Sequence, residues 1–141
     1  MSSGELHTTF LDGAKGRLFA IARKPPRHCD GVLFVPPFAE EMNKSRHVFT
    51  EIALRLVGRG MGSVLVDLHG TGDSEGEFAS TDWQGWVTDL TAAFKWAAAL
   101  GIRVNRLLAL RLGCALAAQA AVDNEWRLER SVFIQPLLGG A

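Results

Sequence analysis

The sequence contains little that would mark a disulfide-bonded, metal-binding or nucleic-acid-binding protein. It has only two cysteines, Cys29 and Cys114, which lie far apart in the chain. Such a pair fits reduced thiols better than a disulfide framework or a zinc site, which needs closely spaced ligands. Fifteen basic and fifteen acidic residues cancel, so the overall charge favours neither nucleic acid nor an anionic membrane as a partner. We therefore expect no metal, no cofactor and no nucleic-acid partner.

The sequence also lacks a long hydrophobic run. Its first ten residues have no basic start followed by an apolar stretch, which a signal peptide would show. The most apolar helical segment, Leu112 to Val122, is far shorter than the ~20 residues that a membrane span needs. A chain of 141 residues suits one domain and can remove about 70% of its unfolded surface from water. We expect a single domain over residues 1–141 in a cytoplasmic protein.

What the sequence does contain is an alternation of strand and helix patterns. Two short strand patterns flank a polar, glycine-containing turn and predict a hairpin, and continuous apolar runs predict buried strands. Apolar residues at helical spacing predict three helices, the second of which begins near Ser80 or Thr81. The predicted strands cover residues 6–10, 18–22, 31–38, 63–68, 105–110 and 131–138, and the helices cover 43–59, 80–100 and 112–122. This order predicts an α/β fold, a doubly wound and mostly parallel sheet with an antiparallel N-terminal hairpin.

Three loops follow predicted parallel strands, at the edge where such sheets bind ligands. The first loop is "PPFAEEMNKSRH", residues 36–47. Backbone N–H groups near Phe38 fit one half of an oxyanion hole. Glu40 and Glu41 fit either carboxylates of a site or a solvated acidic pair at a helix N-terminus, where the dipole favours negative charge.

The second loop, "VDLHGTGDSEGE" at residues 66–77, predicts a demanding turn. It departs from a dinucleotide-binding fingerprint because Glu75 occupies the third glycine position. Gly70 and Gly72 allow backbone angles that are closed to other residues, and the Asp67 carboxylate can accept hydrogen bonds from loop N–H groups. For Ser74 a role in the turn is favoured over a catalytic one.

The third segment, "LLALRLGCALAA" at residues 107–118, predicts a buried strand that turns sharply into a buried helix. A nucleophile elbow, G-x-S-x-G, needs small residues beside a strained central residue. Aligned on Gly113, the small flanks are Ala109 and Gly113, and the central residue is Arg111. A guanidinium with a pKa above about 12 can act neither as an acyl nucleophile nor as a general base at neutral pH. Centring the motif on Cys114 places leucines at the flanks, so Cys114 is the weaker candidate nucleophile and fits a small buried hydrophobe.

Together these segments resemble the N-terminal part of an α/β-hydrolase. The stretches that carry the resemblance are "VLFVPPFAEEMNKSR", "DLHGTGDSEGEF", "DWQGWVTDL" and "LLALRLGCALAA". The particular combination is similar to the type 2 hydrolase-like proteins of the exosortase A system, which accompany bacterial exopolysaccharide and protein-sorting genes. The resemblance covers residues 31–138 and implies a hydrolase fold that is truncated after about the sixth strand. It also implies oxyanion-hole N–H groups near Phe38 and at Leu112.

Two departures from the superfamily pattern argue against hydrolysis. Arg111 stands where the serine belongs, and the superfamily order of Ser, Asp and His places the acid and the base after the nucleophile. The four histidines, at positions 7, 28, 47 and 69, all precede it. Two hypotheses stay open. One is a non-catalytic binding or scaffold module of the exosortase-linked pathway. The other is an active ester or thioester hydrolase that uses groups outside this chain or an unusual nucleophile.

Arg111 itself has three candidate roles. At a helix N-terminus its charge costs about 0.3–1 kcal/mol unless an anion compensates. It pairs with Glu40 or Glu41, or it binds a small acyl or anionic ligand together with the helix N-terminus, or it extends into water. If 141 residues is the full length of the protein, the last predicted strand has no following helix to cover it. An uncovered strand predicts a homo-oligomer, most simply a homodimer through that strand.

Overall fold

The computed structural model describes residues 4–36, 40–68 and 82–134, with the side chains of residues 40–45 outside the description. The element order is the one predicted from the hydrophobic patterns. In chain order the elements are β1 (Glu5–Asp12), β2 (Arg17–Lys24), β3 (Cys29–Val35), α1 (Glu40–Gly58), β4 (Gly62–Val66), α2 (Trp83–Ala99), β5 (Ile102–Leu110), α3 (Leu112–Asp123) and β6 (Arg130–Ile134).

The six strands form one mixed sheet in the order β1-β2-β4-β3-β5-β6. Strand β2 runs antiparallel to both of its neighbours, β1 and β4. The pairs β4–β3, β3–β5 and β5–β6 are parallel. The predicted fold class, a mostly parallel sheet entered by an antiparallel hairpin, is confirmed. Because β3, β4 and β5 are parallel, their carboxyl ends share one edge of the sheet, where the three loops of interest begin.

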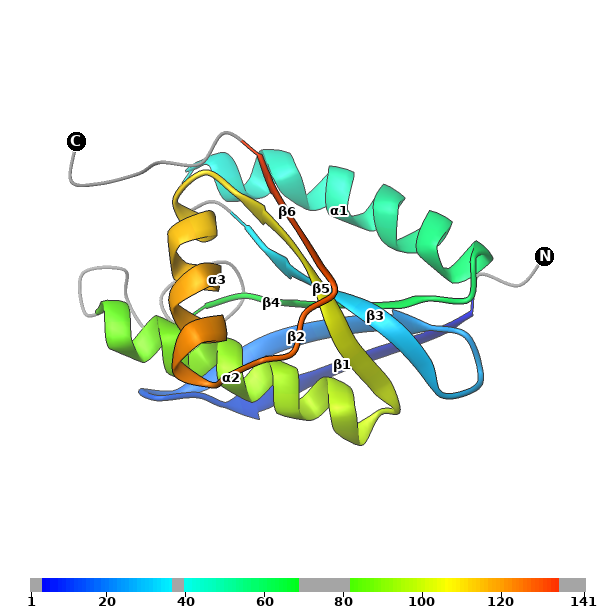
Figure 1. Ribbon diagram of the computed structural model, residues 1–141, viewed down its shortest axis with the longest axis horizontal. Helices are drawn as coiled ribbons and strands as arrows, with labels where there is room; N and C mark the ends of the chain where they lie inside the picture. The colour runs from blue at the N-terminus through cyan, green and yellow to red at the C-terminus, as the bar shows by residue number, and fades with distance from the viewer. Residues whose placement is uncertain (1–3, 37–39, 69–81, 135–141) are drawn as a thin grey trace.

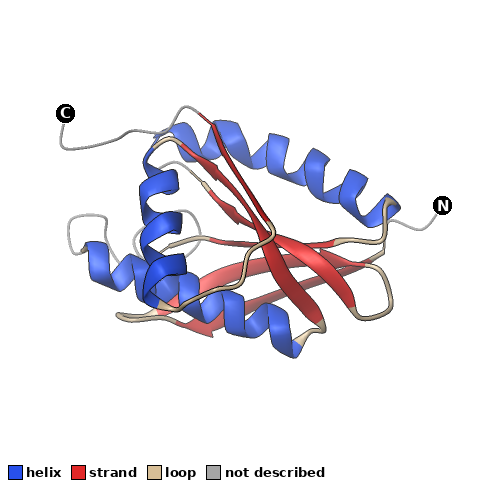
Figure 2. Ribbon diagram, in the orientation of Figure 1, coloured by secondary structure: helices blue, strands red, loops and turns tan. Residues whose placement is uncertain are grey.

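Helices cover both faces of the sheet (Figures 1 and 2). Helices α2 and α3 contact each other and pack over β3, β4 and β5, whereas α1 packs over β2 and β4. Successive residues of β3 face the two helix layers in turn, since successive side chains of a strand point to opposite faces of the sheet. Leu33 and Val35 join the cluster under α2 and α3, and Phe34 joins the cluster under α1.

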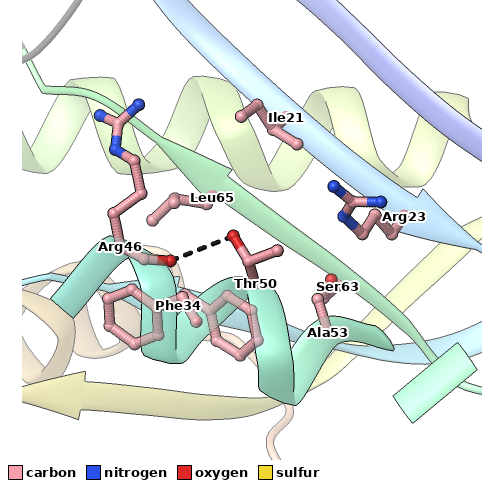
Figure 3. A pocket seen from close by; sticks show the side chains of 9 residues that line it. Ile21, Arg23, Phe34, Arg46, Thr50, Ala53, Ser63 and Leu65 are labelled. Carbon is pink, nitrogen blue, oxygen red and sulfur yellow. Dashed lines mark hydrogen bonds between the residues drawn. The ribbon is translucent and has the colours of Figure 1, made fainter. Parts of the chain in front are cut away.

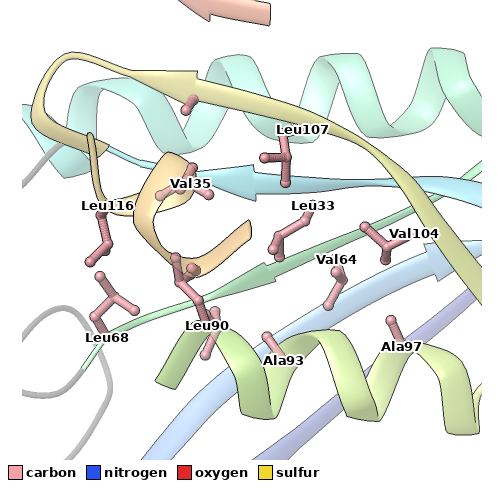
Figure 4. Close-up of a cluster of buried hydrophobic side chains, with 14 of the residues drawn as sticks. Leu33, Val35, Val64, Leu68, Leu90, Ala93, Ala97, Val104, Leu107 and Leu116 are labelled. Carbon is pink, nitrogen blue, oxygen red and sulfur yellow. The ribbon is translucent and has the colours of Figure 1, made fainter. Parts of the chain in front are cut away.

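The larger hydrophobic core lies between the sheet and helices α2 and α3 (Figure 4). At its centre Leu90 of α2 is fully buried and faces the sheet. Leu116 of α3 is equally buried, so the two helices share this core. The smaller core under α1 is built on Phe34 and Phe49, whose rings stack with centroids 4.9 Å apart.

The predicted start of the second helix is wrong by two or three residues. Helix α2 begins at Trp83, and its N-cap is Asp82. The Asp82 carboxylate accepts a hydrogen bond from the Gly85 N–H at 2.6 Å. Aspartate satisfies an otherwise orphaned N–H of the first turn and is among the preferred capping residues, which accounts for the later start.

Strand β6 lies at the edge of the sheet and pairs with β5. All five of its residues are exposed, among them Val132, Phe133 and Ile134. The predicted homodimer through this strand stays a prediction. Among the described helices, none combines the length and the apolar character needed to cross a bilayer.

Truncating Leu90 tests this description of the core. Leu90→Ala should lower the free energy of unfolding by about 3 kcal/mol, because it removes a fully buried side chain and leaves a cavity. Urea denaturation measures the change. The matched control is Val122→Ala on the exposed side of α3, where the side chain is 72% exposed and the loss should stay within about 0.5 kcal/mol. Similar losses at both positions would contradict the assignment.

Candidate functional site

Strand β5 passes into helix α3 through a single residue, Arg111, which has φ 52° and ψ −123°. Positive φ is unfavourable for a residue with a side chain, so the neighbouring structure must hold it. The Arg111 N–H donates to the Ile134 carbonyl at 2.9 Å, and the Arg111 carbonyl accepts from the Cys114 N–H at 3.0 Å. One hydrogen bond ties the bend to β6, and the other begins the first turn of α3.

Small residues flank the bend because α3 starts directly against the end of β3. A Cβ atom on Gly113 would lie 2.6 Å from the Pro36 carbonyl oxygen and 2.8 Å from that of Val35. On the strand side Ala109 is fully buried. A strained central residue between two small ones, at a strand-to-helix turn, is the backbone arrangement of a nucleophile elbow. In this chain the residue at its tip is Arg111.

The predicted partners of Arg111 are only partly described. Glu40 and Glu41 begin helix α1, but their side chains lie outside the description, so an ion pair with Arg111 stays a prediction. Phe38, the predicted first half of an oxyanion hole, also lies outside the described residues. Leu112 is the first residue of α3 and is 36% exposed. Its N–H belongs to the first helical turn, where N–H groups lack partners within the helix.

Asp67 lies at the carboxyl end of β4 and is 2% exposed. Its carboxylate accepts a hydrogen bond from Nη2 of Arg46, on α1, at 2.5 Å. Its backbone N–H donates to the Phe19 carbonyl of β2 at 2.9 Å. Asp67 is therefore held by α1 and β2. The turn residues Gly70, Gly72 and Ser74, predicted to lie next to it, fall outside the described residues.

Arg46 is not among the residues that the sequence patterns single out. Arg46 is the last residue of the "PPFAEEMNKSR" segment. Its position on a helix does not indicate which carboxylate it pairs with. The available signal is Asp67 itself, because a carboxylate at the end of a buried strand needs a donor or a cation. The ion pair connects the first two of the three loop segments.

The environment of Cys114 disfavours the alternative nucleophile. Its side chain is buried behind the bend, with Sγ 3.9 Å from the Ile134 carbonyl oxygen. Burial raises the pKa of the Cys114 thiol, so the reactive thiolate is scarcer than for an exposed cysteine at neutral pH.

Burial likewise raises the pKa of the Cys29 thiol. Cys29 begins β3 and therefore lies at the opposite end of this strand from the candidate site. Within the described residues, no three His, Cys, Asp or Glu side chains gather to hold a metal ion.

The fold matches α/β-hydrolases of known structure. An α/β serine hydrolase without a lid from Xanthomonas campestris matches with a TM-score of 0.76 and 23% identity, over 97% of this chain and 64% of that one. Est1E from Butyrivibrio proteoclasticus, with ferulic acid bound, matches with a TM-score of 0.77 and 20% identity, over 91% and 52%. An α/β serine hydrolase homologue from Coxiella burnetii matches with a TM-score of 0.72 and 21% identity, over 92% and 62%.

These similarities define the class of protein: the chain has an α/β-hydrolase fold and spans between about half and two thirds of the length of these structures. A family model narrows the class. The model of the X-Pro dipeptidyl-peptidase (S15) family matches residues 24–127, and the chain belongs to this family. No curated protein matches the sequence.

The Arg46–Asp67 ion pair predicts a measurable loss of stability. Arg46→Ala should lower the free energy of unfolding by about 2–3 kcal/mol, because it leaves a buried carboxylate without its charged donor. Arg55→Ala is the matched control, since it removes the same side chain from an exposed position on the same helix. It should cost less than about 0.5 kcal/mol. Equal losses in urea denaturation would show that the pair contributes nothing.

Helix propensity alone would make an alanine at position 113 stabilising. The close approach of α3 to the end of β3 at Gly113 predicts a loss of stability instead. Gly113→Ala should destabilise the protein by about 2 kcal/mol, because the new methyl group would lie within 3 Å of two backbone oxygens. The control is Gly58→Ala at the end of α1, where a Cβ meets nothing within 4 Å. There alanine should be neutral or stabilising by up to about 1 kcal/mol. A Gly113→Ala variant as stable as the wild type would refute the geometry of the bend.

Proposed function

We propose that this chain is a non-hydrolytic member of its fold, which binds a small anionic or acyl ligand at the carboxyl edge of the sheet. The observation that carries the proposal is Arg111 at the tip of the strand-to-helix bend. A guanidinium does not attack an acyl carbon at neutral pH. Its planar set of N–H donors instead matches the oxygens of a carboxylate or a phosphate.

The first turn of α3 supports an anion as the ligand. Arg111 precedes the helix, and the N–H groups of Leu112 and Gly113 are two of the donors that the turn leaves without acceptors inside the helix. The helix dipole adds positive potential at the same place. Est1E, which shares the fold, has ferulic acid bound, so a carboxylic acid is a ligand class known among proteins of this fold. The intramolecular alternative is a carboxylate of this chain, Glu40 or Glu41.

The second candidate is an active ester or thioester hydrolase that uses groups outside this chain. It is favoured by the family, and by the fact that the chain spans only part of the serine hydrolase structures that it matches. For the cellular setting, the resemblance to the exosortase-associated type 2 proteins supports a role in bacterial exopolysaccharide assembly, in the cytoplasm.

Two assays on the whole chain separate these candidates. We expect no turnover of short-chain nitrophenyl esters and no labelling by a fluorophosphonate probe, because the side chain at position 111 carries no hydroxyl. We also expect ferulate and inorganic phosphate to shift the amide NMR signals of Leu112 and Gly113. Arg111→Gln should weaken that binding about tenfold, since it removes a charge-assisted contact.

The controls identify the outcome that would overturn the proposal. Cys114→Ala should change neither assay, because the thiol is buried and its raised pKa keeps it protonated. Ester turnover that persists in both Arg111→Ala and Cys114→Ala would establish another nucleophile and the second candidate. Arg55→Gln, which removes a charge far from the bend, should leave ligand binding unchanged.

A further inference from the structure

A cavity of about 60 Å³ lies on the face of the sheet opposite α3, between α1 and strands β2 and β4 (Figure 3). One water molecule needs about 10–15 Å³ in this measure, so the cavity has room for the body of a small organic molecule. It belongs neither to the bend at Arg111 nor to the core beneath α2 and α3.

The walls of the cavity are mainly apolar. Ile21 and Leu65 contribute from the strands, and Ala53 contributes from α1 (Figure 3). The stacked rings of Phe34 and Phe49 complete the apolar lining. Such a surface favours an alkyl group over water, because each buried methylene contributes about 0.8 kcal/mol in general. The apolar part of a ligand would therefore lie against α1 and β4.

The two charged side chains of the lining are both cationic. Arg23 and Arg46 lie at opposite ends of the lining, with Thr50 between them (Figure 3), and no acidic side chain of the described residues lines the cavity. Arg46 is engaged by Asp67, and the Thr50 hydroxyl donates to the Arg46 carbonyl at 3.1 Å. Arg23 is half-buried and makes no ion pair with any residue that the structure describes. The complement of this end of the cavity is an anion.

We propose that the cavity binds a short-chain carboxylate, a molecule such as hexanoate. Its carboxylate accepts hydrogen bonds from the Arg23 guanidinium, and its alkyl chain packs against Phe34, Phe49 and Leu65. Charge and shape act together here, because a half-buried guanidinium gains from an anion that replaces lost water, while the apolar walls select an alkyl body. The site is independent of the anion site proposed at Arg111.

A titration of the whole chain with hexanoate, followed by amide NMR, tests the proposal. The signals of Thr50, Ser63 and Leu65 should shift, with a dissociation constant on the order of 1 mM for so small a ligand. Arg23→Gln should weaken binding about tenfold. Hexanol, which has the same chain without the charge, should bind about tenfold more weakly than hexanoate and equally to both proteins.

Matched variants show whether hexanoate binds in this cavity and through Arg23. Arg55→Gln removes one positive charge from the exposed side of α1 and should leave binding unchanged, as should Arg111→Gln at the bend. Ala53→Leu fills the cavity and should abolish binding. Absent shifts at Thr50, Ser63 and Leu65, an equal loss in Arg55→Gln, or unchanged binding in a folded Ala53→Leu would each overturn the proposal. If Ala53→Leu does not fold, the comparison of Arg23→Gln with Arg55→Gln decides the question.

Discussion

The contact between the first turn of α3 and the carbonyl groups at the end of β3 is the constraint on which the candidate site depends. Gly113 allows this approach, and the hydrogen bond from the Arg111 N–H to Ile134 fixes the direction in which the chain leaves β5. Both interactions involve the backbone. These two contacts do not depend on which side chain stands at position 111. The α/β-hydrolase architecture of the chain therefore does not by itself determine the chemistry at the tip of the bend.

A second contact attaches α1 to the sheet, as the contact at Gly113 attaches α3. Arg46 connects the helix to Asp67 at the end of β4, so the helix layers on the two faces of the sheet are both attached to its carboxyl edge. The two attachments differ in kind. The contact at Gly113 requires the absence of a side chain, whereas the ion pair joins the buried Asp67 carboxylate to a partly exposed guanidinium. The cavity of about 60 Å³ lies against α1 beside Arg46, and Phe49 and Ala53 are part of its lining.

The sequence predicts the fold well because its signals are local. The order of strands and helices follows from hydrophobic periodicity, and the bend follows from the small residues around Arg111. The Arg46–Asp67 pair could not be predicted in the same way, because it depends on how α1 is rotated and placed over β4. The cavity beside Arg23 has no sequence signal at all, since it results from the shapes of side chains on several elements. The predictions for Phe38, Gly70, Gly72 and Ser74 concern residues outside the description.

The backbone conformation of Arg111 bears on the role proposed for its side chain. A residue other than glycine at positive φ costs on the order of 1–3 kcal/mol, and glycine would remove that cost at a position with φ 52°. A serine there is explained in active hydrolases by the attack that the bend makes possible. In this chain a large, charged residue keeps the same strained backbone at the start of α3, where its charge is also unfavourable to the helix dipole. Contact between the guanidinium and an anion, as we propose, would offset both unfavourable terms.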